Sequence, residues 1–140
     1  MIFRKFFKKK DTPSNDNILV IALLIHAARI DENYTENEKN IIKKTIMELN
    51  QVNLTESEKL LKIAEKKEEE SNQIVEFTRE IKKYSNEFRL KIIEIIWKIV
   101  YSDGTSDNYE SNLVRRICGL LYVSDKESGT IKTKIKNLLK

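Results

Sequence analysis

Two acidic pairs with the same spacing occur in this sequence of 140 residues: Asp31 with Glu38, and Asp103 with Glu110. Six residues separate the members of each pair. Carboxylate oxygens without a His or Cys ligand suit Ca²⁺, Mg²⁺ or Mn²⁺ better than zinc. If the fold brings the pairs together, the four residues form one acidic cluster, a candidate site for a divalent cation or for a basic protein partner.

Helix capping offers a second explanation for the two glutamates. Thr35 with Glu38, and Asp107 with Glu110, have the spacing of a capping box, in which two side chains satisfy backbone amides at a helix start. Capping does not explain Asp31 and Asp103, because each follows a predicted helix whose dipole disfavours a negative charge by about 0.3–1 kcal/mol. Hydrogen bonds to loop amides or a bound cation could each compensate, so both interpretations stay open.

The second acidic pair lies in the stretch YSDGTSDNYE, which is not an EF-hand loop. An EF-hand loop has glycine at its sixth position and a bidentate glutamate at its twelfth. Counted from Asp103, Gly104 is second and Glu110 is eighth. A metal site here would therefore have a different construction.

The elements that must position these residues are predicted to be helices. A chain with one proline and three glycines lacks the frequent turns of an all-β protein. Apolar residues three and four apart instead predict about seven helices, of which the very apolar stretch 86–101 should be the central one. The predicted ranges are about 16–30, 35–50, 55–70, 74–84, 86–101, a sixth helix from 107, and a last one carrying Ile131 to Leu139. Capping boxes at Thr35–Glu38 and at Thr55–Glu58 are expected to start the second and third helices.

An internal duplication relates the two acidic corners. Shifting the sequence by 72 residues places Asp31 on Asp103 and Glu38 on Glu110, and apolar positions such as Ile42 and Val114 also coincide. We interpret this as two copies of a helix-corner-helix unit whose apolar faces pair about a pseudo-twofold axis. The predicted fold class is therefore all-α, an orthogonal helical bundle with an internal repeat.

The net charge of +4 comes from one end of the chain. Residues 1–10 contain five cations and no acid, and subtracting these five charges leaves −1 for the rest, which argues against a nucleic-acid interface on the folded part. We divide the chain into a basic, aromatic tail, 1–16, and a helical domain, 17–140. The tail is either a solubilising terminus or a contact to an anionic membrane surface. Its cations are Arg4, Lys5, Lys8, Lys9 and Lys10.

The remaining composition indicates a non-enzymatic protein of a reducing, cytoplasmic compartment. The apolar run ILVIALLIHAA has eleven residues, fewer than the roughly 20 that span a bilayer, and no signal-peptidase motif follows it. Cys118 is the only cysteine and cannot form an intramolecular disulfide. His26 is the only histidine, and no nucleophile–base pair or glycine-rich phosphate loop accompanies it.

The stretches IALLIHAARIDENYTENEKNII and EIIWKIVYSDGTSDNYESNLVRRICGLL resemble the bacterial TerB family of tellurite-resistance proteins and its TerB-like relatives. The resemblance runs from about residue 17 to the end. It implies an all-helical bundle with a duplicated acidic corner, related to a domain that opens a membrane-anchored DnaJ-like co-chaperone. The family's acidic positions, proposed to bind metal or a partner, fall on Asp31, Glu38, Asp103 and Glu110. Glu32 departs from the family's glycine, so the first corner is expected to close differently.

These observations lead to one functional hypothesis and three competitors, one of which is a purely structural interaction module. The chain is expected to be a non-catalytic stress-response domain that binds a divalent cation, a protein partner or both at its acidic corners. A peripheral membrane adaptor docking through the tail is the first alternative. A nucleic-acid module using the tail and the C-terminal lysines is the second, and the charge distribution disfavours it.

Overall fold

The computed structural model describes residues 14–30, 33–71, 73–102 and 108–138. Within these residues it forms seven helices and no strand, which confirms the predicted all-α fold class. The helices are α1 (Ser14–Arg29), α2 (Glu36–Asn50), α3 (Leu54–Glu70), α4 (Val75–Ile81), α5 (Asn86–Val100), α6 (Asn108–Leu120) and α7 (Asp125–Leu138).

Local capping chemistry determines several of these boundaries. The predicted box at Thr35 is present and starts α2. The predicted box at Thr55 and Glu58 is wrong, because α3 already begins at Leu54 with Asn53 as its N-cap, whose side chain accepts from the Glu56 amide. Asparagine caps a helix as well as threonine does, and here it precedes the threonine.

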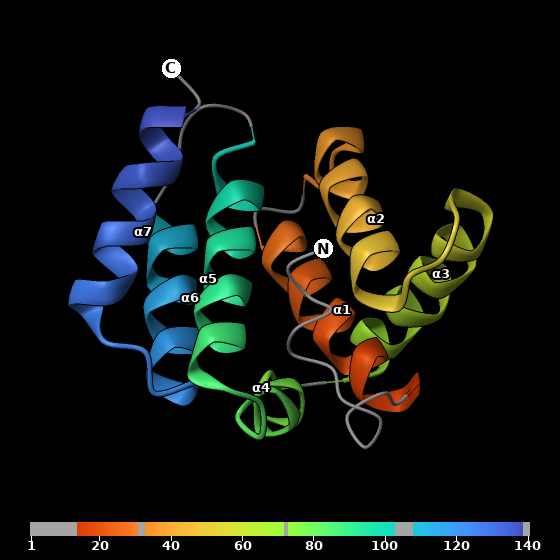
Figure 1. Ribbon diagram of the computed structural model, residues 1–140, viewed down its shortest axis with the longest axis horizontal. Helices are drawn as coiled ribbons and strands as arrows, with labels where there is room; N and C mark the ends of the chain where they lie inside the picture. Colours follow the sequence, from red (N-terminus) through yellow and green to blue (C-terminus); the bar gives the residue numbers. More distant parts are fainter. Residues whose placement is uncertain (1–13, 31–32, 72, 103–107, 139–140) are drawn as a thin grey trace.

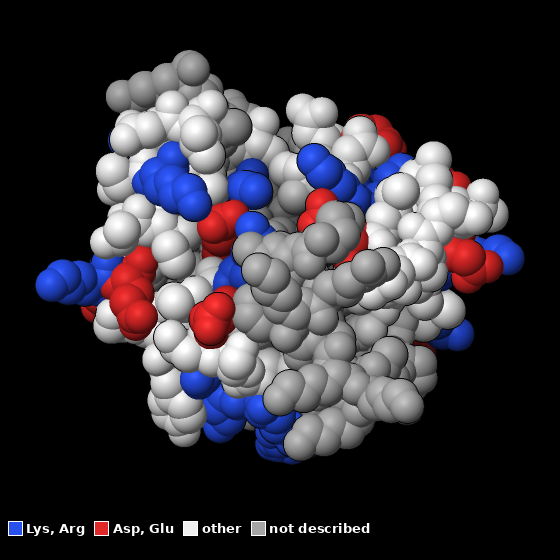
Figure 2. Space-filling view, viewed as in Figure 1, with Lys and Arg blue, Asp and Glu red and all other residues white. Residues whose placement is uncertain are grey.

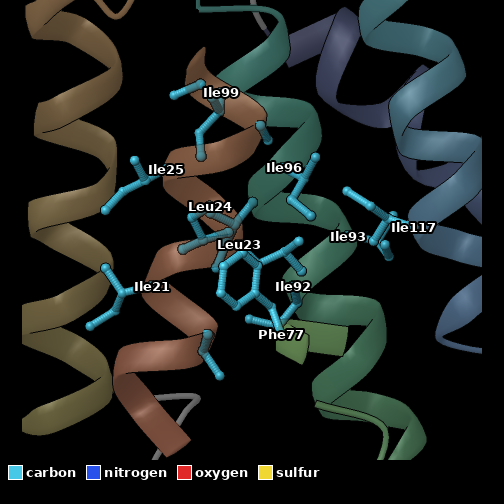
Figure 3. Packing of buried hydrophobic residues seen from close by; sticks show 14 of the residues in the cluster. Ile21, Leu23, Leu24, Ile25, Phe77, Ile92, Ile93, Ile96, Ile99 and Ile117 are labelled. Carbon is cyan, nitrogen blue, oxygen red and sulfur yellow. The ribbon is translucent and has the colours of Figure 1, made fainter. Parts of the chain in front are cut away.

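The core is organised around two helices, α1 and α5 (Figure 1). Helix α1 contacts α2 to α6, and α5 contacts α1, α2, α6 and α7, so the prediction that α5 alone is central is wrong. The apolar run in α1 explains the difference, because every residue from Val20 to Ile25 is fully buried. In Figure 3, Leu23 and Leu24 of α1 face Ile92 and Ile96 of α5, with Phe77 of α4 beside them.

The internal duplication comprises three helices in each copy rather than two. Helix α3 packs on α1 as α7 packs on α5, and α4 links the two copies. Both second helices end on a left-handed residue, Gln51 (φ 54°) and Tyr122 (φ 59°). The next amide then bonds back in the same way, Val52 N to Met47 O at 3.3 Å and Val123 N to Cys118 O at 2.9 Å. We call α1–α3 the first unit and α5–α7 the second unit.

The offset between the units changes from 72 to 71 residues at the end of α6. Through α2 and α6 the buried pairs Ile42/Val114 and Ile46/Cys118 keep the offset of 72. The left-handed residues and the buried serines Ser57 and Ser128 are 71 apart. The Ser57 amide donates to the Asn53 carbonyl, and the Ser128 amide donates to the Ser124 carbonyl, both at 3.0 Å. Asn53 and Ser124 are the residues directly before α3 and α7. Residues of α3 and α7 therefore correspond at an offset of 71.

The helix ends that precede or follow the two acidic corners in sequence can be located in the bundle. In Figure 1 the end of α5, the beginning of α2 and the end of α7 lie together at the upper end of the view. None of the helices in the described ranges is long and apolar enough to cross a membrane.

Candidate functional site at the helix corners

The first predicted glutamate, Glu38, is a capping residue. Its Oε1 accepts from the Thr35 amide at 2.7 Å and from the Thr35 hydroxyl at 3.2 Å, and its own amide donates to Thr35 Oγ1 at 3.1 Å. The side chain sits in the first turn of α2 with the residue only 4% exposed. A carboxylate here also interacts favourably with the positive end of the helix dipole.

The second predicted glutamate, Glu110, occupies the equivalent place in α6. It lies in the first turn and is 5% exposed, so the two units bury the same side chain at the same position. Asp31 and Asp103, the other two predicted ligands, lie outside the described residues, and so does Asp107. Among the residues that the structure describes, no three His, Cys, Asp or Glu side chains are grouped so that they could hold a metal ion.

A hydrogen bond from Tyr34 links the first corner to α3. The Tyr34 hydroxyl donates to Glu65 Oε2 at 2.8 Å. The cations of Arg29 and Lys39 lie 5.0 Å and 4.9 Å from the centre of its ring. Burial and the hydrogen bond to Glu65 raise the pKa of Tyr34 above its ordinary value, so the hydroxyl keeps its proton and remains a donor.

An ion-pair network continues along the same side of α3. Arg29 Nη1 donates to Glu68 Oε1 at 2.5 Å, and His26 Nδ1 lies 3.1 Å from Glu68 Oε2. Glu68 therefore joins two side chains of α1 to α3. His26 is half-buried, and at the 72-residue offset it corresponds to Lys98, which is also half-buried.

The second corner is supported by aromatic packing. Tyr101, the C-cap of α5, stacks on Trp97 with ring centres 5.8 Å apart. Trp97 Nε1 donates to Ser128 Oγ at 3.1 Å, which ties α5 to α7. Cys118 is buried nearby, and burial raises the pKa of its thiol, as expected for an unreactive structural cysteine.

A groove opens beside the first corner. Its volume is about 410 Å³, and it joins the first turns of α2, the end of α5 and the end of α7. Leu138 contributes an apolar side chain in a residue that is 67% exposed. We call this the corner groove; its lining residues are Asn37, Asn40, Ile41, Lys98, Ser102, Ile135 and Leu138. Asn37 adjoins Glu38 of the first corner, and Ser102 follows the end of α5, so the groove borders the first corner and the end of α5.

Charged residues on the rest of the surface are mixed. On the face shown in Figure 2, the coloured basic and acidic side chains are interspersed rather than separated into two patches. Glu94 illustrates this, since it pairs with Lys91 at 2.8 Å and with Lys98 and Lys134 at 3.5 Å each. The predicted membrane contacts, Arg4, Lys5, Lys8, Lys9 and Lys10, lie outside the described residues.

Comparison with protein families identifies the chain. The family model described as "Tellurite resistance protein TerB" matches residues 17–133, most of the sequence. The chain belongs to the TerB family. Comparison with curated proteins and comparison with solved structures gave no match. The family assignment confirms the resemblance, and the seven helices agree with the TerB-like fold expected from it.

Sequence reasoning missed the corner groove and the network around Tyr34. Both combine residues far apart in the chain, such as Asn37 with Leu138 and Tyr34 with Glu65. One signal was available for the groove. Ile131, Ile135 and Leu138 continue one helical apolar spacing to the end of α7, so the sequence places an apolar side chain at this end of the helix.

Proposed function

We propose that this TerB protein is a non-catalytic, tellurite-resistance-type binding domain that holds a protein partner in its corner groove. The observation that carries the proposal is the groove itself. It is predominantly apolar, it adjoins the first acidic corner, and it contains side chains of both units. An apolar pocket with a few polar groups at its edge is the usual form of a binding site.

The lining of the groove indicates the chemistry of the partner. Ile41, Ile135 and Leu138 would receive an apolar side chain, and the amides of Asn37 and Asn40 can bond to the partner's backbone. Lys98 lies on the lining, but it already pairs with Glu94 at 3.5 Å. An exposed, neutral helix or extended segment with one large apolar anchor residue fits these features.

A divalent cation at the corners is the second proposal. It is supported by the burial of Glu38 and Glu110 at equivalent positions of the two units. Against it, Glu38 Oε1 already accepts two hydrogen bonds within its capping box. Titration of Ca²⁺, Mg²⁺ and Mn²⁺ into isotope-labelled protein tests it directly. Saturable amide shifts at 33–38 and 108–112 that disappear in Asp103→Asn would support a metal site, and unchanged spectra would end the proposal.

Site-specific photocrosslinking tests the partner. A photoreactive amino acid replaces Leu138 in the groove or, as the matched control, Ile63, an apolar residue of α3 that is 54% exposed and does not line the groove. The proposal expects an adduct of defined mass in tellurite-treated cells from position 138 and none from position 63. The adduct should disappear when Asn40→Arg fills the groove. Equal adducts from both positions, or none from position 138, would refute partner binding at the groove.

The membrane alternative has its own test. Liposomes containing anionic lipid should retain the full chain and release a chain that lacks residues 1–10 if the tail docks there. No retention of the full chain would remove this alternative and leave the groove proposal unaffected.

A further inference from the structure

A second hollow lies between α5, α6 and α7, apart from the corner groove. It has a volume of about 200 Å³ and is lined by Trp97, Ser111, Arg115, Asp125, Gly129 and Lys132. Ser128 also lines the hollow. The Ser128 Oγ accepts a hydrogen bond from Trp97 Nε1 at 3.1 Å, which holds the indole ring in place on one side of the hollow. The space equals that of about six or seven water molecules, enough for one side chain and too little for a cofactor.

The first unit has an ion pair at the place that corresponds to this hollow. There, Lys43 of α2 pairs with Glu58 of α3, with Nζ 3.7 Å from Oε2. At the offset of 72, Lys43 corresponds to Arg115. At the offset of 71, Glu58 corresponds to Gly129. The second unit therefore keeps the cation and replaces its carboxylate partner with a residue that has no side chain.

Among the residues that the structure describes, Arg115 forms no ion pair in place of this one, although Asp125 lies on the rim of the same hollow. A second cation faces the hollow, because Lys132 Nζ lies 5.1 Å from the centre of the Trp97 ring. The counterpart of Lys132 is Leu61, a buried core residue, so the second unit has gained a positive charge here.

Packing does not explain the glycine. A Cβ added at Gly129 would meet no atom within 4 Å. Glycine is the least favoured helix residue apart from proline, and Gly129 lies inside α7. Its effect in the structure is to keep space open between one arginine and one lysine.

We propose that this hollow binds a carboxylate side chain of an acidic partner segment, in the place that Glu58 occupies in the first unit. Arg115 pairs with the incoming carboxylate, Lys132 supplies the second positive charge, and the Ser111 hydroxyl can donate a hydrogen bond. The site does not depend on the corner groove, since the two share no lining residue.

The only tryptophan of the chain lines the hollow and reports its occupation. The probe is the blocked hexapeptide acetyl-(Glu)₆-amide, titrated at low salt while Trp97 fluorescence is recorded; acetyl-(Gln)₆-amide is the uncharged control. We expect a saturable change with the glutamate peptide only. Arg115→Gln should weaken it about two- to fivefold, the effect of losing one solvent-exposed ion pair. Lys43→Gln, the matched change in the first unit, should leave it unchanged.

A second variant supplies the missing group from within the chain. Gly129→Glu should pair with Arg115 as Glu58 pairs with Lys43, and should abolish the response to the peptide. Circular dichroism confirms that each variant is folded. Equal responses to both peptides, undiminished binding by Arg115→Gln, or a response to inorganic phosphate but not to the glutamate peptide would overturn the proposal.

Discussion

The substitution Glu38→Gln separates capping from charge at the first corner. A glutamine keeps the Oε1 acceptor and can complete a capping box, but it carries no charge. If capping is the structural role of Glu38, the bonds at 2.7 Å and 3.2 Å from Thr35 survive the change. The interaction of the charge with the helix dipole is lost, which costs about 0.3–1 kcal/mol.

Glu38→Ala removes both acceptor contacts and gives the comparison. The Thr35 amide then lacks its partner at a buried helix start, a penalty of about 1–3 kcal/mol, and the hydroxyl loses a bond worth about 1 kcal/mol. We therefore expect a loss of about 2–4 kcal/mol for alanine, several times that for glutamine. Urea unfolding followed by Trp97 fluorescence and circular dichroism measures both values.

Glu36→Gln is the matched control. Glu36 lies in the same first turn of α2, is exposed, pairs with Lys39 at 3.9 Å, and takes no part in the box, so Glu36→Gln should also cost no more than about 1 kcal/mol. If Glu38→Gln were as destabilising as Glu38→Ala, the charge itself would stabilise the fold and the capping argument would be refuted. A stabilisation of the unsubstituted chain by Mg²⁺, Ca²⁺ or Mn²⁺ that Glu38→Gln abolishes would identify that charge as a cation ligand.

Three further predictions concern other parts of the structure. Asn53→Ala should destabilise the protein by about 1 kcal/mol and Thr55→Ala by much less, because the former caps α3; equal losses in urea unfolding would contradict the assignment. The pKa of Tyr34 lies above the ordinary value of 10, so the contribution of Tyr34 to the free energy of unfolding is complete below pH 10 and declines above it. Tyr34→Phe should remove this alkaline decline. The same substitution should cost about 1 kcal/mol at neutral pH, because the hydrogen bond to Glu65 is lost. Burial raises the pKa of Glu94, but its three lysine neighbours outweigh burial and hold the pKa below the ordinary 4.5. The free energy of unfolding should therefore fall as pH decreases below about 4.5. Glu94→Gln should reduce this loss of stability at acid pH, and an unchanged loss would contradict the prediction.

Features that depend on neighbouring residues were predicted well from the sequence. The capping box at Thr35 involves residues three apart, and the buried faces of α1 and α5 follow from apolar spacing along each helix. The error at Thr55 arose because two competent capping residues stand two positions apart. Local pattern alone does not decide between them, whereas packing of α3 on α1 and α2 does.

Features that depend on the pairing of distant helices were predicted less well. The duplication was recognised through α2 and α6, but the one-residue change of offset concealed the relation of α3 to α7. Without the correspondence of α3 and α7, nothing in the sequence distinguishes Gly129 from the other two glycines. With it, the same residue marks the place where the second unit lacks the carboxylate of Glu58.

The two units of this TerB protein use their charges differently, and the difference suggests where partners bind. In the first unit, Glu58, Glu65 and Glu68 of α3 pair with side chains of α1, α2 and the corner. Helix α7 of the second unit has lysines at several positions and a glycine opposite Arg115, and it borders both the corner groove and the hollow. A unit whose charges are satisfied internally stabilises the fold, whereas one that leaves cations facing a cavity is suited to recognise an acidic surface. Binding is therefore expected on the α7 side of the bundle, with the first unit as its structural support.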